Sequence, residues 1–205
     1  MTGYVLSRRG ACAGLFAVLA GCSVTPQSTL SPQDQSDIAR IQSYLDGLRG
    51  LRAKFVQTGP DGAITRGMAW YDPGRLRLQY DASGGLVVVA FGQHLVAHRN
   101  SDDSTTRIAL SNNPLGLLLA HPLHLSGDIE VTDIQRGPGI LQASLARAAN
   151  PAQGLLTLIL SDQPAGLGLI GLEAVDSRRQ RTHFQLSDAR AGLDLDPALF
   201  KPPAS

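Results

Sequence analysis

The sequence predicts a mainly β fold with helices, in which a curved antiparallel sheet or open barrel encloses an apolar cavity. Segments that alternate apolar and polar residues recur about every eight to twelve residues with Gly, Asp and Pro between them, as in an antiparallel meander. Two of these segments are apolar on both sides of the pleat. The chain also has too few helical segments to cover both faces of a sheet with helices.

The first predicted element is an amphipathic helix over residues 34–48. Ser31 is placed to cap it, Pro32 takes the first helical position and Asp34 adds an acid to the first turn. Gly50 supplies the stop. The apolar residues that recur at helical spacing are Ile38, Ile41, Leu45 and Leu48. One face of this helix is therefore expected to be buried.

After this helix the period changes from helical to two, which predicts strands. Asn113-Pro114 and the leucines after it interrupt the pattern and predict a short helix over residues 114–120, ending before Pro122. The tail that ends the chain is irregular and is expected to be held by Phe200. The predicted strands lie at residues 51–56, 64–70, 75–80, 86–91, 94–99, 105–110, 129–134, 140–146, 155–161, 167–175 and 181–187.

The two strands that are apolar throughout, 86–91 and 155–160, require a cover on both faces. Helices 34–48 and 114–120 can cover one face of the sheet. An apolar cavity inside a curved sheet or open barrel would account for the other face, and its natural occupant would be apolar too. A closed sheet packed on itself, without a cavity, is the alternative that periodicity leaves open.

The N-terminal residues 1–21 are expected to be a signal peptide. Arg8-Arg9 precedes an apolar run that is shorter than the roughly 20 residues of a membrane-spanning helix. The residues Leu19-Ala20-Gly21-Cys22 resemble the bacterial lipobox, in which the cysteine is lipidated and becomes the mature N-terminus. Residues 22–33 would then be a lipidated tether and residues 34–205 the folded domain. A signal peptide that is simply cleaved is the alternative.

The composition argues against several classes of function. The 18 basic and 17 acidic residues nearly cancel, so the sequence predicts neither nucleic-acid binding nor a strongly basic membrane-binding face. His121 and His124 are separated by a proline and have no acid or cysteine at ligand spacing, so no metal site is expected. No nucleophile elbow or other local catalytic signature is present, so no catalytic residue is predicted and a hydrolase ranks last among the classes considered. No cofactor is predicted. Residues 178–181 are expected at an exposed hairpin tip, with contact to anionic lipid heads as the weaker alternative.

Four segments, in this order and at this spacing, resemble the LolA/LolB family of periplasmic lipoprotein carriers and anchored lipoprotein receptors. The resemblance covers about residues 41–203. One departure is Asp72, which stands where the carriers have an arginine that holds their lid closed. The segments are 53-AKFVQT-58, 67-GMAWYDPGRLRLQY-80, 113-NPLGLLL-119 and 195-LDPALFKPP-203.

The resemblance implies an eleven-stranded unclosed barrel capped by helices, whose cavity holds the acyl chains of a client lipoprotein without catalysis. The short helix would place Leu115, Leu118 and Leu119 over the cavity mouth as a lid. With Asp72 in place of the arginine, this lid is expected to close mainly through apolar contacts. The residues expected in the core or cavity wall are Leu78, Val88, Leu158 and Phe184.

The expected partners are lipoprotein acyl chains, a lipoprotein-releasing transporter or carrier, and the membrane through the lipid on Cys22. Because Ser23 rather than aspartate follows the cysteine, the protein is expected at the outer membrane, facing the periplasm. It is expected to be a monomer. A soluble periplasmic carrier and an envelope scaffold with the same fold are the alternatives.

Overall fold

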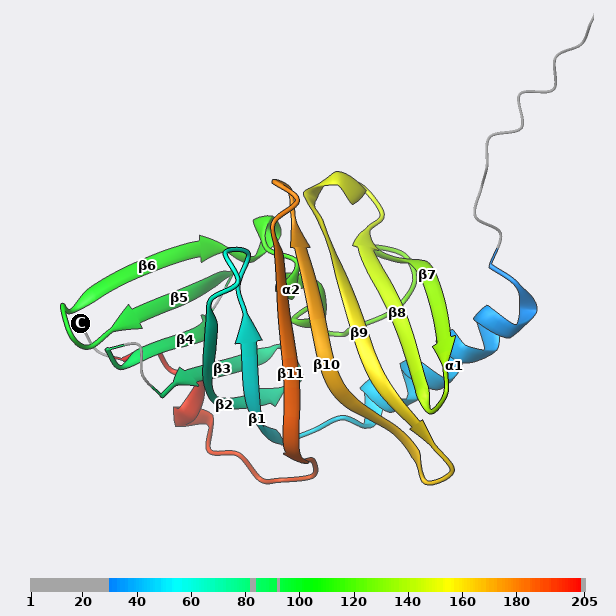
Figure 1. Cartoon of the computed structure of the whole chain (residues 1–205), viewed down its shortest axis with the longest axis horizontal. Helices are drawn as coiled ribbons and strands as arrows, with labels where there is room; N and C mark the ends of the chain where they lie inside the picture. The colour runs from blue at the N-terminus through cyan, green and yellow to red at the C-terminus, as the bar shows by residue number, and fades with distance from the viewer. Residues whose placement is uncertain (1–29, 82–83, 92, 204–205) are drawn as a thin grey trace, which may run out of the picture.

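The computed structural model describes residues 30–81, 84–91 and 93–203. The predicted signal peptide and Cys22 lie outside these residues, as does most of the predicted tether. The described chain forms one sheet of eleven antiparallel strands in the order β6-β5-β4-β3-β2-β1-β11-β10-β9-β8-β7. The sheet is curved and its two edge strands do not pair, so it is an unclosed barrel (Figure 1). The predicted fold class is confirmed.

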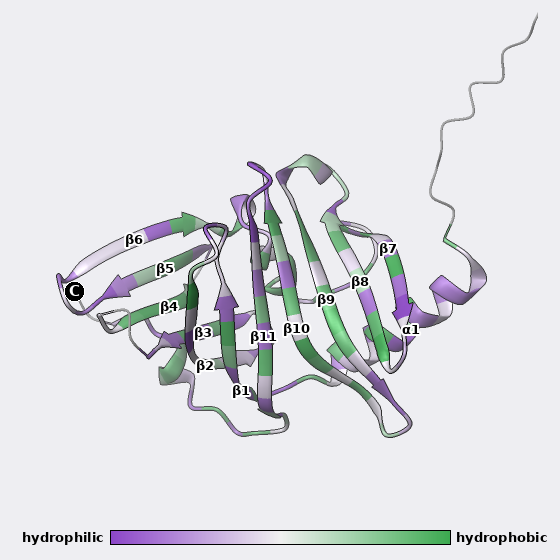
Figure 2. Ribbon diagram, in the orientation of Figure 1, coloured by the Kyte–Doolittle hydropathy of each residue, from purple (hydrophilic) through white to green (hydrophobic). Residues whose placement is uncertain are grey.

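Each predicted strand has a counterpart in the sheet. The alternation along them is visible as changing hydropathy from residue to residue (Figure 2). The first six strands are β1 (Leu51–Thr58), β2 (Ile64–Asp72), β3 (Arg75–Tyr80), β4 (Leu86–Phe91), β5 (His94–Arg99) and β6 (Ser104–Ala109). The others are β7 (Ile129–Gly137), β8 (Ile140–Arg147), β9 (Gly154–Gln163), β10 (Gly166–Asp176) and β11 (Arg181–Arg190).

The first helix forms as predicted, as α1 (Pro32–Gly47). The Ser31 hydroxyl accepts a hydrogen bond from the Asp34 N–H at 3.1 Å, and the Asp34 carboxylate accepts one from the Ser31 N–H at 2.8 Å. This reciprocal pair is a capping box, which satisfies two N–H groups at the start of the helix. The buried face of α1 includes Ile41 and Leu45.

The second helix, α2 (Leu115–Leu118), is a single turn and is shorter than the predicted 114–120. Pro114 occupies the N-cap position, and the Asn113 side-chain oxygen accepts a hydrogen bond from the Leu115 N–H at 2.9 Å. The chain leaves the helical conformation at Leu119, where φ is −95° and ψ is 2°. Short 3-10 helices precede α2 (η1, Leu110–Asn112), follow β8 (η2, Pro151–Gln153) and close the chain (η3, Pro197–Phe200).

Both α-helices lie on the same, inner face of the sheet (Figure 1). The buried residues of β3 show the pattern: Leu76, Leu78 and Tyr80 face inward and alternate with Arg75, Arg77 and Gln79 on the outer face. The inner residues of the strands, α1 and the segment around α2 form one apolar core. Among the described residues, no helix combines the length and the hydropathy needed to cross a membrane.

The outer face of β4 has a cover that the sequence argument did not foresee. Val87 and Val89 are buried, yet they alternate with the inward-facing Val88. The C-terminal η3 packs on this outer face against β3 and β4, and Phe200 is buried there. The Arg77 guanidinium donates to the Leu199 carbonyl oxygen at 3.1 Å. The second apolar face of β4 therefore reflects burial by the chain's own tail and not a cavity, whereas the tail's anchoring by Phe200 is as predicted.

Candidate functional site

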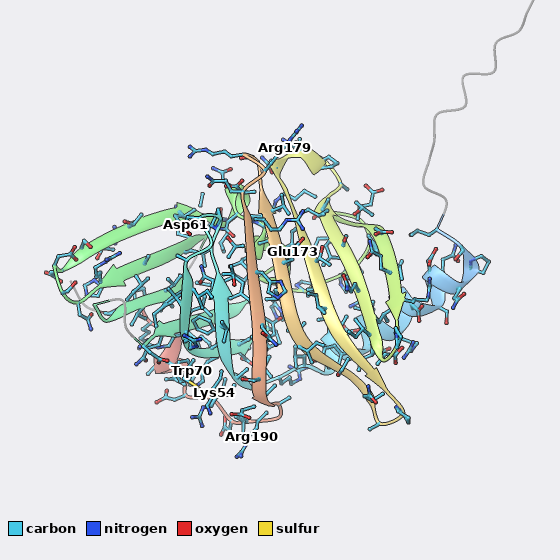
Figure 3. The ribbon with its side chains drawn as sticks, viewed as in Figure 1. Lys54, Asp61, Trp70, Glu173, Arg179 and Arg190 are labelled. Atoms are coloured by element: carbon cyan, nitrogen blue, oxygen red, sulfur yellow. The ribbon has the colours of Figure 1, made fainter. Side chains whose placement is uncertain are left out.

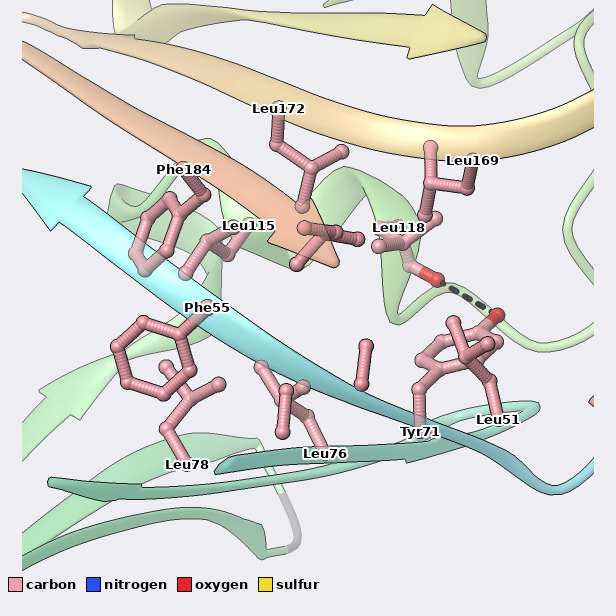
Figure 4. Close-up of a pocket in the computed structure, with 13 residues that line it drawn as sticks. Leu51, Phe55, Tyr71, Leu76, Leu78, Leu115, Leu118, Leu169, Leu172 and Phe184 are labelled. Atoms are coloured by element: carbon pink, nitrogen blue, oxygen red, sulfur yellow. Dashed lines mark hydrogen bonds between the residues drawn. The ribbon is translucent and has the colours of Figure 1, made fainter. Parts of the chain in front are cut away.

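An apolar cavity lies between the inner face of the sheet and α2 (Figure 4). Strands β1, β2, β3, β10 and β11 form its wall, and α2 closes it on the opposite side. No polar surface is exposed inside it. Its lining residues are Leu51, Ala53, Phe55, Ala69, Tyr71, Leu76, Leu78, Leu115, Leu118, Leu169, Leu172, Phe184 and Leu186.

The cavity is nearly closed in this structure. Its volume is about 40 Å³, which is room for roughly three water molecules. Space of this size cannot hold an acyl chain, so an apolar ligand larger than a few atoms requires that α2 or the wall move. The Phe55 ring makes edge-on contacts with the rings of Tyr80 and Phe184, with centroids 5.1 and 5.9 Å apart. These three rings fill one end of the cavity wall.

A second and larger pocket lies next to this end of the cavity. It measures about 300 Å³, at the lower end of the range of roughly 300–1,000 Å³ that ligand sites occupy. Leu78, Leu115 and Phe184 line both spaces. The second pocket also has polar members, including Gln57 and Asn113. We call it the outer pocket; Leu115 of α2 lies where the cavity and the outer pocket meet.

Two tyrosines of the wall keep their hydroxyl groups protonated. Burial raises the pKa of both Tyr71 and Tyr80 to about 12. The Tyr71 hydroxyl donates to the Leu118 carbonyl oxygen of α2 at 3.4 Å (Figure 4). The Tyr80 hydroxyl donates to the Gln57 side-chain oxygen at 2.6 Å. The contact between the cavity wall and α2 is therefore apolar except for the hydrogen bond from Tyr71 to Leu118.

The structure brings some of the predicted site residues together and separates others. Leu78, Leu115 and Phe184 line both spaces, and Leu118 lines the cavity. Val88 is half-buried and lines the outer pocket alone. Leu158 and Leu119 are buried in the core without lining either space.

Asp72 lies away from the lid. It follows the inward-facing Tyr71 on β2, so its side chain is on the outer face. There its carboxylate accepts a hydrogen bond from the Gly50 N–H at 3.2 Å, which holds the turn between α1 and β1. The side chain of Asp72 therefore points away from the face of the sheet on which α2 lies.

Sequence reasoning missed nine of the thirteen lining residues of the cavity, Tyr71 and Leu172 among them. The alternation in β2 and β10 could have placed both on the inner face, but it does not say which inner residues lie opposite α2. Within the described part of the chain, no group of three or more His, Cys, Asp or Glu side chains is placed to hold a metal ion.

Solved structures that are similar to this chain include the following three. A LolA superfamily protein from Nitrosomonas europaea has a TM-score of 0.48 at 13% identity, over 82% of this chain and 97% of that one. An uncharacterized conserved protein from Thermus thermophilus scores 0.47 at 9% identity, over 83% and 95%. The lipoprotein LppX from Mycobacterium tuberculosis scores 0.37 at 11% identity, over 80% and 100%.

No curated protein matches the sequence. The family comparison, in contrast, matches residues 46–203, which is most of the chain and includes every strand and α2. The matching family is described as the outer membrane lipoprotein carrier protein LolA. It is a bacterial envelope family of carriers, not of enzymes. The chain with this unclosed barrel and apolar cavity belongs to the LolA family.

Proposed function

We propose that this protein is a non-enzymatic chaperone or acceptor for lipoproteins, which shelters their acyl chains during localisation to the outer membrane. The observation that carries the proposal is the cavity without polar surface beneath α2, which shares three lining residues with the larger outer pocket. Family membership supports the same class of ligand.

The energetics of the cavity suit an acyl chain. Each methylene removed from water contributes about 0.8 kcal/mol, so one sheltered chain offsets much of the exposure that keeps a lipoprotein in the membrane. The closed cavity of about 40 Å³ is too small for this ligand. Binding therefore selects an open state in which α2 has moved outward and Leu115 no longer separates the cavity from the outer pocket.

Within this function, we propose the acceptor role, with a lipid on Cys22 that anchors the protein to the outer membrane. Two or three acyl chains hold a protein too firmly for free diffusion, so an anchored protein receives lipoproteins and does not shuttle them. If the signal peptide is simply cleaved, the protein is a soluble periplasmic carrier. The mass of the mature N-terminal peptide decides between them: a lipid-modified Cys22 supports the acceptor, and an unmodified fragment refutes it.

The central experiment measures transfer of acyl chains. A chain that begins at Ser23 retains every element of the described fold, which starts at Leu30. We expect it to draw a lipoprotein with fluorescent acyl chains out of vesicles into a soluble one-to-one complex. Leu118→Asp places a charge in the cavity lining and should prevent the complex; circular dichroism checks that this variant still folds, because Leu118 is buried. Ile64→Asp, at an apolar residue that is 58% exposed, is the matched control.

Absence of any acyl-chain complex with the folded wild-type chain would refute the transfer function. It would favour an envelope scaffold with the same fold.

A further inference from the structure

The outer face of the sheet carries a row of basic side chains with a tryptophan among them. The strand register places Arg190 of β11 opposite Arg52 of β1, Arg52 opposite Trp70 of β2, and Trp70 opposite Arg77 of β3. Residues directly opposite each other across antiparallel strands share a face and lie about 4.5–5.5 Å apart. These four residues therefore form one continuous row, which we call the basic row.

One further basic residue borders the basic row, and two carboxylates lie near it: Asp188, and Asp72, two residues after Trp70 on the same face of β2. Lys54 lies next to Arg52 on the same face of β1, and Figure 3 shows Lys54, Trp70 and Arg190 at the same end of their strands. Lys54 pairs with Asp188 at 2.7 Å. Among the described residues, no carboxylate lies within 4.0 Å of the guanidinium groups of the basic row. The guanidinium groups of the basic row therefore form no direct ion pair in the described chain, although the charge of Arg190 helps to lower the pKa of the nearby Asp188 carboxyl.

Arg77 differs from the other two arginines of the row because its hydrogen bonds are inside the fold. It donates to the Leu199 carbonyl oxygen at 3.1 Å and to the Gln79 side-chain oxygen at 3.4 Å. Its partial burial lowers the pKa of its guanidinium. Arg52 and Arg190 are exposed, so they are the members free to meet an external anion.

A β-bulge puts Arg190 in the row. Lys54 pairs with Ser187, and Arg52, two residues earlier in β1, pairs with Arg190, so β11 has one extra residue between the two pairs. Asp188, in this bulge, has a positive φ of 51°, which is uncommon for residues other than glycine. In regular pairing Ala189 would face Arg52, and Arg190 would point to the inner face.

Like charges directly opposite each other destabilise a sheet. The bulge in β11 places the like charges of Arg52 and Arg190 opposite each other, and their repulsion destabilises the folded protein when no anion is bound. An anion bound between the two side chains would relieve this repulsion. Arginine binds phosphate oxygens in bidentate geometry. Tryptophan prefers the interface between apolar and aqueous phases, where its ring is buried and its N–H stays wet.

We propose that the basic row is a docking surface for an anionic phospholipid membrane, with Arg52 and Arg190 on lipid phosphates and Trp70 at the level of the headgroups. An acidic protein would satisfy the arginines, but it gives no reason for a half-exposed tryptophan between them. The surface is on the opposite face of the sheet from the cavity, so docking leaves α2 free to move. The proposal is independent of a lipid on Cys22.

Trp70 is the chain's single tryptophan, so its fluorescence reports on this surface alone. The test uses the chain from Ser23, which cannot be anchored through Cys22. Vesicles of phosphatidylcholine with phosphatidylglycerol should shift the Trp70 emission to shorter wavelength and should sediment the protein. Vesicles of phosphatidylcholine alone should do neither, and added salt should reverse the binding.

Variants that replace charged arginines with neutral glutamine test whether the membrane binds at the basic row. Each basic residue near an anionic surface contributes about fivefold in affinity, so the double variant Arg52→Gln, Arg190→Gln should bind about 25-fold more weakly. The matched control removes two charges from the β10–β11 hairpin tip, Arg178→Gln and Arg179→Gln, and should retain binding. The thermal midpoint of the first variant should be unchanged or higher, because a like-charge pair is removed.

Three results would overturn the proposal. The first is that the control loses as much binding as the basic-row variant. The second is sedimentation with vesicles while the Trp70 emission stays unchanged. The third is a polyglutamate that binds as tightly as the anionic vesicles and competes with them, which would assign the surface to an acidic protein partner.

Discussion

The hydroxyl of Tyr71, on β2, donates a hydrogen bond of 3.4 Å to the carbonyl oxygen of Leu118, the last residue of α2. The described residues give α2 no other side-chain hydrogen bond to the strands of the cavity wall. The sequence-based expectation was that this lid closes mainly through apolar contacts. Leu115 and Leu118 do provide such contacts, and Tyr71 adds one polar contact from the residue beside Asp72.

We expect Tyr71→Phe to make the cavity open more readily and to accelerate uptake of a fluorescent fatty-acid probe. A neutral hydrogen bond contributes about 0.5–1.5 kcal/mol, and this long one belongs at the low end, so the rate should rise about twofold. The measurement is stopped-flow uptake. Tyr80→Phe is the control, since it loses only the bond to Gln57. Slower uptake by Tyr71→Phe than by the control would contradict a role in closure.

Val88→Asp and Leu158→Asp should have different effects, although the sequence placed both residues in the core or cavity wall. Leu158 has no exposed surface, and an unpaired charge there costs several kcal/mol, so this variant should not fold. Val88 is half-buried in the wall of the outer pocket, where the carboxylate can reach water. Val88→Asp should therefore fold and bind acyl chains more weakly. Circular dichroism and probe binding separate the outcomes; normal binding by Val88→Asp would exclude the outer pocket from the ligand path.

The sequence could predict the fold because local patterns are strong in this chain. The alternation in residues 75–80 assigns each side chain of β3 to the correct face, and Ser31, Pro32 and Asp34 define the start of α1. These signals depend only on neighbours in the sequence. Periodicity alone did not decide between a curved open sheet and a closed one. The family resemblance indicated that the sheet curves into an unclosed barrel.

The remaining features depend on pairing between distant residues. Arg52 lies opposite Arg190 only through the β1–β11 register and its bulge, so the balanced composition gave no sign of a basic row. Phe200 covers β4 through the path of the C-terminal tail. The contact of Tyr71 with Leu118 requires that α2 end after one turn. None of these relationships has a short-range sequence pattern.

Substitutions of Asp72 should change stability and leave uptake unaffected. Asp72→Ala removes the acceptor for the Gly50 N–H and should cost about 1 kcal/mol in the free energy of unfolding. Asp72→Arg puts the guanidinium on the outer face, away from α2, so it cannot form the lid contact that the family arginine suggested. Urea unfolding and stopped-flow uptake are the measurements. Slower uptake by Asp72→Arg at unchanged stability would show that an arginine at this position does reach the lid.

A network of charges ties α1 to the sheet. The Arg136 guanidinium, on β7, contacts Asp34 and Asp37 of α1, each at 2.7 Å. Arg40 of α1 bridges Asp37 to Asp162 of β9. Because these contacts hold α1 while α2 has one weak bond to the wall, we expect α2 to move on opening and α1 to stay in place.

Arg136→Gln should lower the urea midpoint at neutral pH, and the loss should disappear in acid. Hydrogen bonds from Ser31 and Arg136 hold the pKa of the Asp34 carboxyl below its usual value of 3.8. A lowered carboxyl pKa stabilises the folded state above the unfolded value, and this stability is lost as the pH falls through the folded pKa. The two proteins should therefore differ at pH 7, and the difference should disappear as the pH falls below 3.8 and through the folded pKa of Asp34. Lys54→Gln, which breaks an exposed pair with Asp188, should have little effect at either pH. An Arg136→Gln deficit of the same size at both pH values would mean that the arginine acts by packing and not through its carboxylate partners.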